Sequence, residues 1–200
     1  MDRGKRLLSR TQLPIFFLLA TLFSWWPAFF TDGRILPYGP AIAAAVVMAM
    51  TAGRRGLGDY WRQITKWRSA WYWYARGPAI ILGYQGAALA IMLLAGASMS
   101  TPLQTSSLAS LLGLILLGGQ WEEPGWSGYA LPRLKENFRQ RQHGILVAIL
   151  ILGIFRALWH LPLFLYGHIP WFDLLAFEIA FQVIIAWIYL GSGGCVPAVM

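Results

Sequence analysis

Long apolar runs, separated by short polar or basic stretches, recur along the whole 200-residue chain. A helix that crosses a lipid bilayer needs about 20 mostly apolar residues. Runs of about this length lie at Leu13–Phe30, Leu36–Ala52, Trp71–Gly96, Leu103–Leu131, Gly144–Tyr166 and Trp171–Leu190, and another begins after Gly191–Gly194. The pattern predicts an all-α bundle of about six complete transmembrane helices and the start of a seventh, in a single domain covering residues 1–200.

The composition agrees with a protein in contact with membrane lipid. Apolar residues make up 58% of the chain and charged residues only 12%, about half the charged share of an average soluble domain. The eleven Trp and eleven Phe residues suit lipid and the bilayer interfaces. The one cysteine, Cys195, excludes an internal disulfide framework and a Cys-rich zinc site.

The positive charge of the chain is concentrated between the apolar runs. The net charge is +8, and fourteen of the sixteen Lys and Arg residues fall within residues 3–10, 54–76 and 133–141. Loops that stay on the cytoplasmic side of a membrane carry such an excess of Lys and Arg. We therefore expect a cytoplasmic N-terminus, with these three segments on the cytoplasmic side, and no nucleic-acid partner.

Five ionisable residues interrupt the predicted membrane helices: Glu122, Glu123, Arg156, His160 and Glu178. Each costs roughly 2.5–3.5 kcal/mol to insert, so such residues usually mark a function or a buried partner. Glu122 lies roughly 16 Å from the cytoplasmic end of its helix, and His160 roughly 25 Å from the start of the next one, at 1.5 Å per residue. The estimate for His160 is deeper, but helix tilt and a later helix start can remove a turn or two of the difference. The two side chains can then meet if these helices pack as an antiparallel pair.

A carboxylate and an imidazole at one buried point suit a divalent metal, most often zinc. Water bound to the metal becomes a nucleophile near neutral pH, and a second carboxylate can act as a general base. Glu122 and Glu123 point about 100° apart on a helix, so one can act in the site while the other braces it. Structural roles remain open for each residue by itself: a helix-to-helix hydrogen bond for His160, a helix end for the acidic pair, and a salt bridge between Glu178 and Arg156.

Two sequence motifs surround these residues. Residues 122–134 read Glu-Glu-Pro-Gly-Trp-Ser-Gly-Tyr-Ala-Leu-Pro-Arg-Leu, and residues 158–164 read Leu-Trp-His-Leu-Pro-Leu-Phe. They resemble the first two motifs of the CPBP family, intramembrane metalloproteases related to type II CAAX prenyl proteases and to bacteriocin-immunity (Abi) proteins. The resemblance implies that Glu122, Glu123 and His160 are catalytic, and that Glu122 and His160 lie at a divalent metal. It further implies hydrolysis of a peptide or membrane-protein substrate by metal-activated water, and we expect a bacterial plasma membrane protein.

The chain departs from the family pattern at three points. Ser127 occupies the position of the family's Arg, and Arg156 that of an aromatic residue. The third motif, a His with Asn or Asp four residues later, does not appear before Met200, so we expect the domain to be incomplete at its C-terminus. Two interpretations of Arg156 are open: it replaces the missing Arg by pairing with Glu123, or it pairs with Glu178 and has a packing role.

These departures leave more than one function open. The first hypothesis is an intramembrane metalloprotease, and the second is a non-catalytic relative of the immunity type. A small transporter is a weaker alternative, because transporters usually contain internal repeats and none is found in the sequence.

Overall fold

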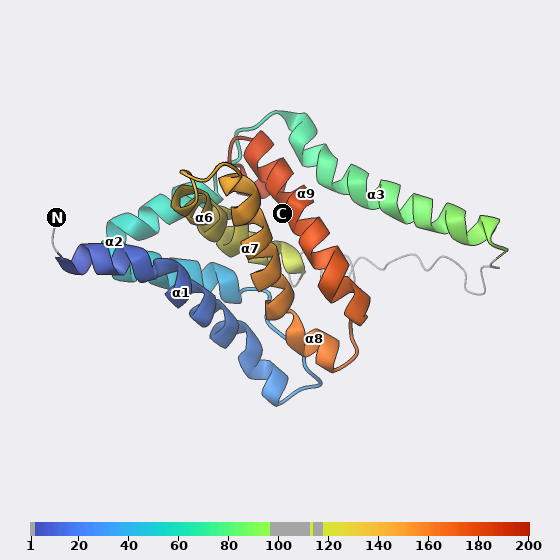
Figure 1. Cartoon of the computed structure of the whole chain (residues 1–200), viewed down its shortest axis with the longest axis horizontal. Helices are drawn as coiled ribbons and strands as arrows, with labels where there is room; N and C mark the ends of the chain where they lie inside the picture. The colour runs from blue at the N-terminus through green and yellow to red at the C-terminus, as the bar shows by residue number, and fades with distance from the viewer. Residues whose placement is uncertain (1–2, 97–112, 114–117) are drawn as a thin grey trace.

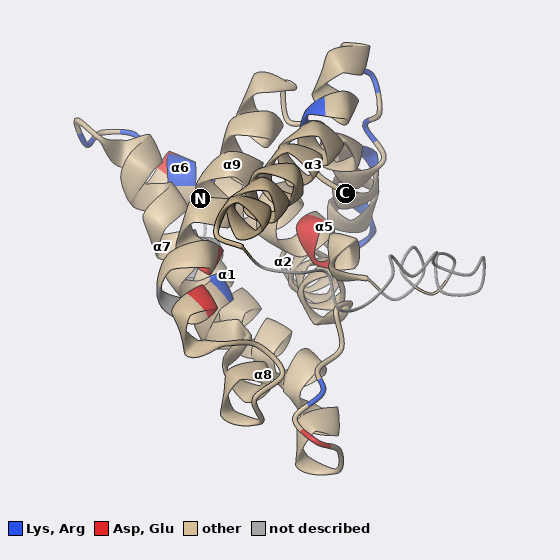
Figure 2. Ribbon diagram, turned by 90° about the vertical axis from the view of Figure 1, so that its right-hand side faces the viewer, with Lys and Arg blue, Asp and Glu red and all other residues tan. Residues whose placement is uncertain are grey.

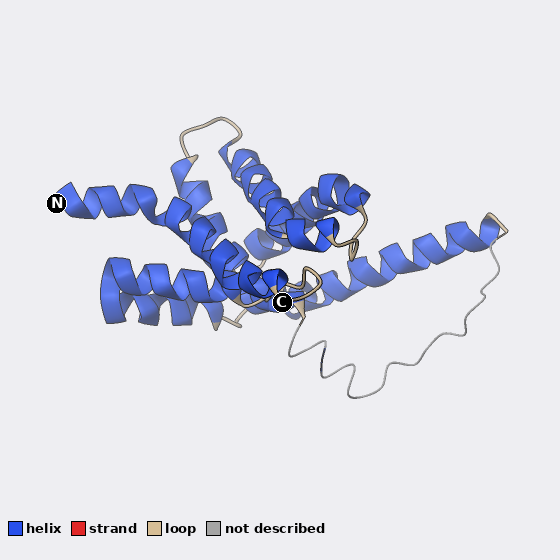
Figure 3. Cartoon of the chain, turned by 90° about the horizontal axis from the view of Figure 1, so that it is seen from below, coloured by secondary structure: helices blue, strands red, loops and turns tan. Residues whose placement is uncertain are grey.

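The computed structural model describes residues 3–96, 113 and 118–200. All regular secondary structure in these residues is helical (Figure 3), which confirms the predicted all-α class. The longer helices are α1 (Arg3–Trp25), α2 (Gly39–Ile64), α3 (Trp71–Leu94), α7 (Gly144–Trp159) and α9 (Glu178–Gly191). Shorter elements are α5 (Glu123–Gly125), α6 (Leu131–Asn137), α8 (Leu161–Leu165), the 3₁₀ turns η1 (Trp26–Phe29), η2 (Gly119–Glu122) and η5 (Val196–Ala198), and the π turns η3 (Trp126–Ala130) and η4 (Asp173–Phe177).

The helices follow most of the predicted apolar runs. The segment Thr11–Phe29 and helix α3 are long and apolar enough to cross a membrane, whereas α7 and α9 are apolar but shorter. Nearly half of the run Leu103–Leu131, namely residues 103–112 and 114–117, lies outside the described residues. The count of about six membrane crossings therefore stays a prediction.

Two predicted runs differ in extent from the observed helices. Helix α2 continues to Ile64, twelve residues beyond the predicted end at Ala52, and bends at Gly53, whose backbone angles are φ 57° and ψ −144°. This left-handed conformation favours glycine because it has no Cβ. The run Gly144–Tyr166 is not one helix, because α7 ends at Trp159 and α8 begins at Leu161. Pro162 in the first turn of α8 lacks the N–H that would continue α7.

Helices α1 and α2 pack closely through small side chains. Ala20, Ala43 and Ala44 are fully buried, and a Cβ on Gly39 would lie 1.9 Å from the Ser24 hydroxyl oxygen. Small residues let helix backbones approach each other, which is a common packing mode within membranes. Helix α2 of this pair contacts the segment from η2 to η3, which contains the acidic residues.

Gly125 fixes the position of the acidic segment against α2. A Cβ at this position would come within 2.4 Å of the Pro40 carbonyl carbon and oxygen at the start of α2. Backbone atoms cannot retreat as a flexible side chain can, so residue 125 must be glycine for this approach. The contact places Glu122 and Glu123, just before Gly125, in the interior of the bundle.

Aromatic side chains fill the space beside the acidic segment. Trp126 packs edge-to-face against Phe16 and Trp159, with ring centroids 5.5 and 5.8 Å apart. The Trp25 indole donates a hydrogen bond of 2.8 Å to the carbonyl oxygen of Trp159 at the end of α7. These contacts hold the end of α7 next to the acidic segment.

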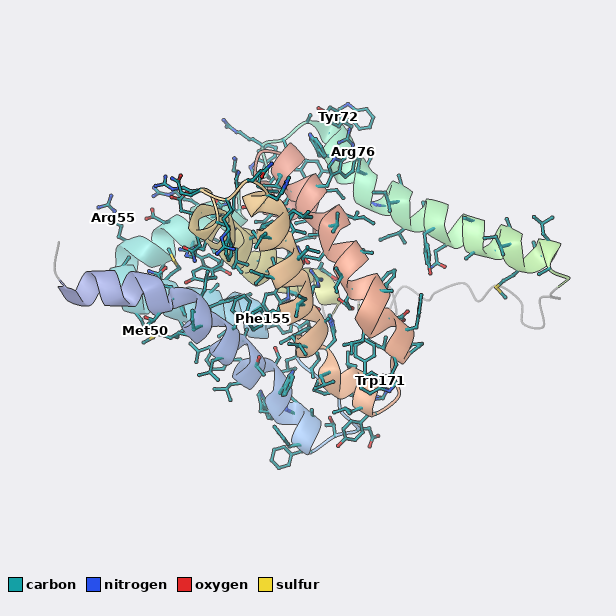
Figure 4. The ribbon with its side chains drawn as sticks, in the orientation of Figure 1. Met50, Arg55, Tyr72, Arg76, Phe155 and Trp171 are labelled. Atoms are coloured by element: carbon teal, nitrogen blue, oxygen red, sulfur yellow. The ribbon has the colours of Figure 1, made fainter. Side chains whose placement is uncertain are left out.

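Helix α3 projects from the rest of the bundle (Figure 1) and has no buried side chain. Its first turns lie against α9, where the Arg76 guanidinium sits 3.7 Å from the Trp73 ring centroid and 4.7 Å from that of Trp187. Arg76 and Tyr72 lie together at the start of the helix (Figure 4). A helix that is apolar on all sides suits contact with lipid.

The predicted orientation has a direct test. Cysteine replacing Arg139, exposed in the turn between α6 and α7, is expected to resist a membrane-impermeant thiol reagent in intact cells, because positive loops resist translocation. Cysteine replacing the exposed Arg34, between η1 and α2, is expected to react. The native Cys195 is buried and gives a low background. Labelling at residue 139 from outside would refute the orientation.

Candidate active site

Arg156, in the last turn of α7, lies at the centre of a buried cluster of acidic side chains. Its Nη1 is 2.5 Å from Glu123 Oε1, its Nη2 is 3.2 Å from Glu122 Oε2, and its Nε is 3.7 Å from Glu178 Oε2. Arg156 and Glu122 are each 5% exposed and Glu123 is 2% exposed. One guanidinium therefore faces three carboxylates in a region from which water is largely excluded.

Glu123 is the most firmly held of the three acids. Besides the ion pair with Arg156, its Oε2 accepts a hydrogen bond of 2.5 Å from the Ser127 hydroxyl, one helical turn further along the chain. Ser127 is itself fully buried. Both oxygens of Glu123 thus have a donor, and its carboxylate is fixed in one orientation.

His160 follows α7 directly and lies between two of the acids. Its Nδ1 is 3.1 Å from the Arg156 carbonyl oxygen and 3.4 Å from Glu178 Oε2, and its Nε2 is 4.0 Å from Glu122 Oε1. Since both neighbours of Nδ1 are acceptors, we assign the proton of the neutral ring to Nδ1. The Nε2 lone pair then faces an oxygen of Glu122, and a cation between these two acceptors would satisfy both.

The ion pairs do not satisfy every polar atom of the cluster. Glu122 Oε2, Glu178 Oε2 and Arg156 Nε have no well-aligned hydrogen bond, although each lies within ion-pair distance of an opposite charge. Gln182, one turn after Glu178 on α9, places its Oε1 3.5 Å from Arg156 Nη1. The cluster therefore retains capacity for a further ligand.

A cavity of about 390 Å³ opens beside the cluster. Glu123 and Arg156 line it together with apolar residues of α3 and α9, among them Pro78, Phe181 and Ile184. A mainly apolar pocket with a few converging charged groups is the usual form of a substrate site.

The donor set has a partial fit to a divalent metal. Within the described part of the chain, no group of three His, Cys, Asp or Glu side chains is arranged to hold one. Glu122 Oε1 and His160 Nε2 are 4.0 Å apart, whereas two ligands of a tetrahedral zinc with bonds of about 2.0–2.2 Å lie roughly 3.4 Å apart. The two side chains would therefore have to move slightly closer to share an ion. Three carboxylates facing one guanidinium also leave an excess of negative charge that a divalent ion would balance. A catalytic zinc site usually has three protein ligands, so Glu122 and His160 would need a third ligand besides themselves to hold such an ion.

The structure brings together the five ionisable residues singled out in the sequence. Arg156 lies within ion-pair distance of both Glu123 and Glu178, the two partners left open by the sequence, and it is closer to Glu123. Two further members were not anticipated as partners: Ser127, which binds Glu123, and Gln182. Both side chains are neutral, so a search for ionisable residues within the apolar runs does not find them.

Comparison with known proteins supports the motif assignment. A family model described as type II CAAX prenyl endopeptidase Rce1-like matches residues 104–200. CAAX prenyl protease 2 of Methanococcus maripaludis is 37% identical to this chain over 59 residues, which are 30% of this chain. The aligned segment spans only 20% of that relative's length. The family-model match contains the motifs at Glu122 and His160, so these findings support the resemblance of this chain to the CPBP family, which includes the type II CAAX prenyl endopeptidases.

Proposed function

We propose that this protein is an intramembrane endopeptidase of the CAAX prenyl protease type that uses water activated by a divalent metal, zinc by preference. The observation that carries the proposal is the pair Glu122 Oε1 and His160 Nε2, two acceptors that face each other 4.0 Å apart inside a buried acidic cluster. A cation between them would satisfy both, and oxygen with imidazole nitrogen is a donor set that zinc accepts.

Each residue of the cluster has a role in this proposal. Glu122 and His160 would hold the ion, which lowers the pKa of its bound water towards neutrality. Glu178 and the Arg156 carbonyl keep the His160 proton on Nδ1, so that Nε2 remains a ligand. Arg156 and Ser127 fix Glu123, and the acidic pair supplies the carboxylate that takes a proton from water and returns it to the leaving amine.

The cavity beside Glu123 and Arg156 suggests how substrate reaches the site. Its apolar lining from α3 and α9 suits the hydrophobic part of a membrane-bound peptide. The relative named CAAX prenyl protease 2 makes a prenylated CAAX peptide the first substrate to test. We further propose a multi-pass protein of a bacterial plasma membrane with its N-terminus in the cytoplasm.

The metal content of the purified protein tests the proposal. We expect zinc to copurify with the wild-type chain in neutral detergent and to be lost, by at least about tenfold, from Glu122→Ala and His160→Ala, because each removes a direct ligand. Glu136→Ala, which removes an exposed acid on α6, is the matched control and is expected to retain the metal.

Two results of elemental analysis would contradict the metal proposal. The first is wild-type protein that takes up no zinc or other divalent ion even after incubation with it. The second is equal metal content in wild type and His160→Ala. Either result would favour the non-catalytic, immunity-type alternative.

A further inference from the structure

A second cavity, of about 510 Å³, lies between the second half of α2, helix α6 and the end of α9. Of the described residues, none lines both this cavity and the one beside Glu123. Its lining includes segments 59–66, 131–135 and 189–194. Two of these segments belong to the basic regions predicted to face the cytoplasm, so the same prediction puts the cavity on the cytoplasmic side.

The charged lining of this cavity is mostly positive. Lys66, Arg133 and Lys135 contribute three cations, and Asp59 is the acid that accompanies them. Asp59 is already ion-paired with Arg62 on the same helix. Among the described residues, no carboxylate lies within ion-pair distance of the three cations. The cavity is therefore a site for a negatively charged group.

Arg133 is held in place with part of its hydrogen-bonding capacity unused. Its guanidinium stacks 3.7 Å from the Tyr129 ring centroid, and its Nη1 donates to the Tyr129 carbonyl oxygen at 3.1 Å. Its Nη2 contacts the sulfur of Met48, which is a weak acceptor. Burial, only partly offset by nearby Tyr129 and Tyr189, lowers the pKa of Arg133 below its ordinary value. Its Nε donates to Gln12 Oε1 at 3.3 Å. An anion in the cavity would supply an oxygen acceptor for Nη2, whose present partner is the Met48 sulfur.

Further hydrogen-bond donors line the cavity. The Tyr189 hydroxyl accepts a hydrogen bond of 2.8 Å from the Gln63 amide, which leaves the hydroxyl proton free to be donated into the cavity. Lys66 Nζ is 2.5 Å from the Gly193 carbonyl oxygen, and this contact anchors the ammonium group at the cavity edge. The cavity thus combines an Arg, two Lys and a Tyr hydroxyl, all donors.

We propose that this cavity binds a phosphate group, supplied either by the headgroup of an anionic phospholipid or by free phosphate. A guanidinium and two ammonium groups around one pocket provide the charge-assisted hydrogen bonds that phosphate oxygens accept. The volume of about 510 Å³ is enough for a headgroup as well as for the phosphate alone. The proposal is independent of the proteolytic site, because it uses none of the residues of the acidic cluster.

Binding to the full-length protein in neutral detergent tests this site. Native mass spectrometry would follow the binding of phosphatidylglycerol, with phosphatidylcholine as the uncharged reference, and equilibrium dialysis would follow inorganic phosphate. Lys66→Gln and Lys135→Gln change exposed side chains, and each is expected to lower affinity for the phosphate ligand about tenfold by removing one charge-assisted hydrogen bond. Arg55→Gln is the matched control, since Arg55 projects from α2 into solvent (Figure 4) and does not line the cavity.

The results separate the two sources of phosphate. Loss of phosphatidylglycerol binding in both lysine variants, with Arg55→Gln unchanged, supports the headgroup. The same loss for inorganic phosphate, with phosphatidylglycerol binding unaffected, supports free phosphate. The proposal is overturned if wild type binds neither ligand, or if Arg55→Gln weakens binding as much as the cavity variants do, since the effect is then one of total charge.

Discussion

Glu122→Gln is expected to reduce peptide cleavage by about 10²–10⁴-fold, the usual contribution of a positioned acid or base. Glutamine keeps the size of the side chain and can still occupy the space between Arg156 and His160. It cannot accept a proton, and it is a poor partner for both the guanidinium and a metal. A prenylated CAAX peptide in lipid vesicles, with product measured by mass spectrometry, provides the assay.

Glu136→Gln is the control for this experiment, because Glu136 is an exposed acid paired with Arg139 on α6. It is expected to cleave at the wild-type rate. Equal membrane insertion of both variants, measured by fractionation, separates a lost reaction from a lost protein. Cleavage by Glu122→Gln at the rate of the control would remove Glu122 from the mechanism.

Arg156→Phe is expected to destabilise the protein by about 3–5 kcal/mol, because removal of one partner leaves buried charges without compensation. Three carboxylates face the guanidinium, and they cannot all remain ionised together without a cation. Denaturant unfolding in neutral detergent, followed by fluorescence of the eleven tryptophans, measures the loss. Arg156→Lys keeps the charge but not the planar guanidinium, so its stability is expected to lie between that of wild type and that of Arg156→Phe.

The exchange Arg156→Ser with Ser127→Arg tests which acid matters most. Ser127 already contacts Glu123, so an arginine at residue 127 is close to the same carboxylate, and the exchange conserves the total volume. We expect it to recover part of the stability and of the zinc content. No recovery, together with an equal defect in Glu178→Gln, would show that Arg156 serves Glu178 instead. Unchanged stability of Arg156→Phe would refute both interpretations.

The sequence predicts that the charged residues lie together, but it predicts the backbone geometry around them less well. The cost of burying Glu122, Arg156 and His160 in apolar helices is large enough to predict that they compensate one another. The estimated depths of Glu122 and His160 along their helices permit these two side chains to meet, and in the structure they lie together with Arg156. The length of an apolar run similarly predicts α3 to within two residues at its C-terminal end.

The backbone conformation around Glu122 and Glu123 is not predicted by the apolar pattern. The run Leu103–Leu131 predicts a continuous helix, yet residues 119–130 pass from a 3₁₀ turn through a short α-helix to a π turn. Within this segment Gly125 approaches Pro40 closely, a tertiary contact that no local pattern contains. The expected divergence of Glu122 and Glu123 does not separate them, because both reach the long side chain of Arg156.

The order in which the cluster is synthesised follows from its arrangement along the chain. Glu123 precedes its cationic partner by 33 residues, and at about 5–20 residues per second Arg156 follows it roughly 2–7 s later. During that interval the acidic pair has no guanidinium, and protonation is the cheapest way to lower its cost in lipid. The cluster is therefore completed only when α7 brings Arg156 to the acidic pair and α9 then adds Glu178.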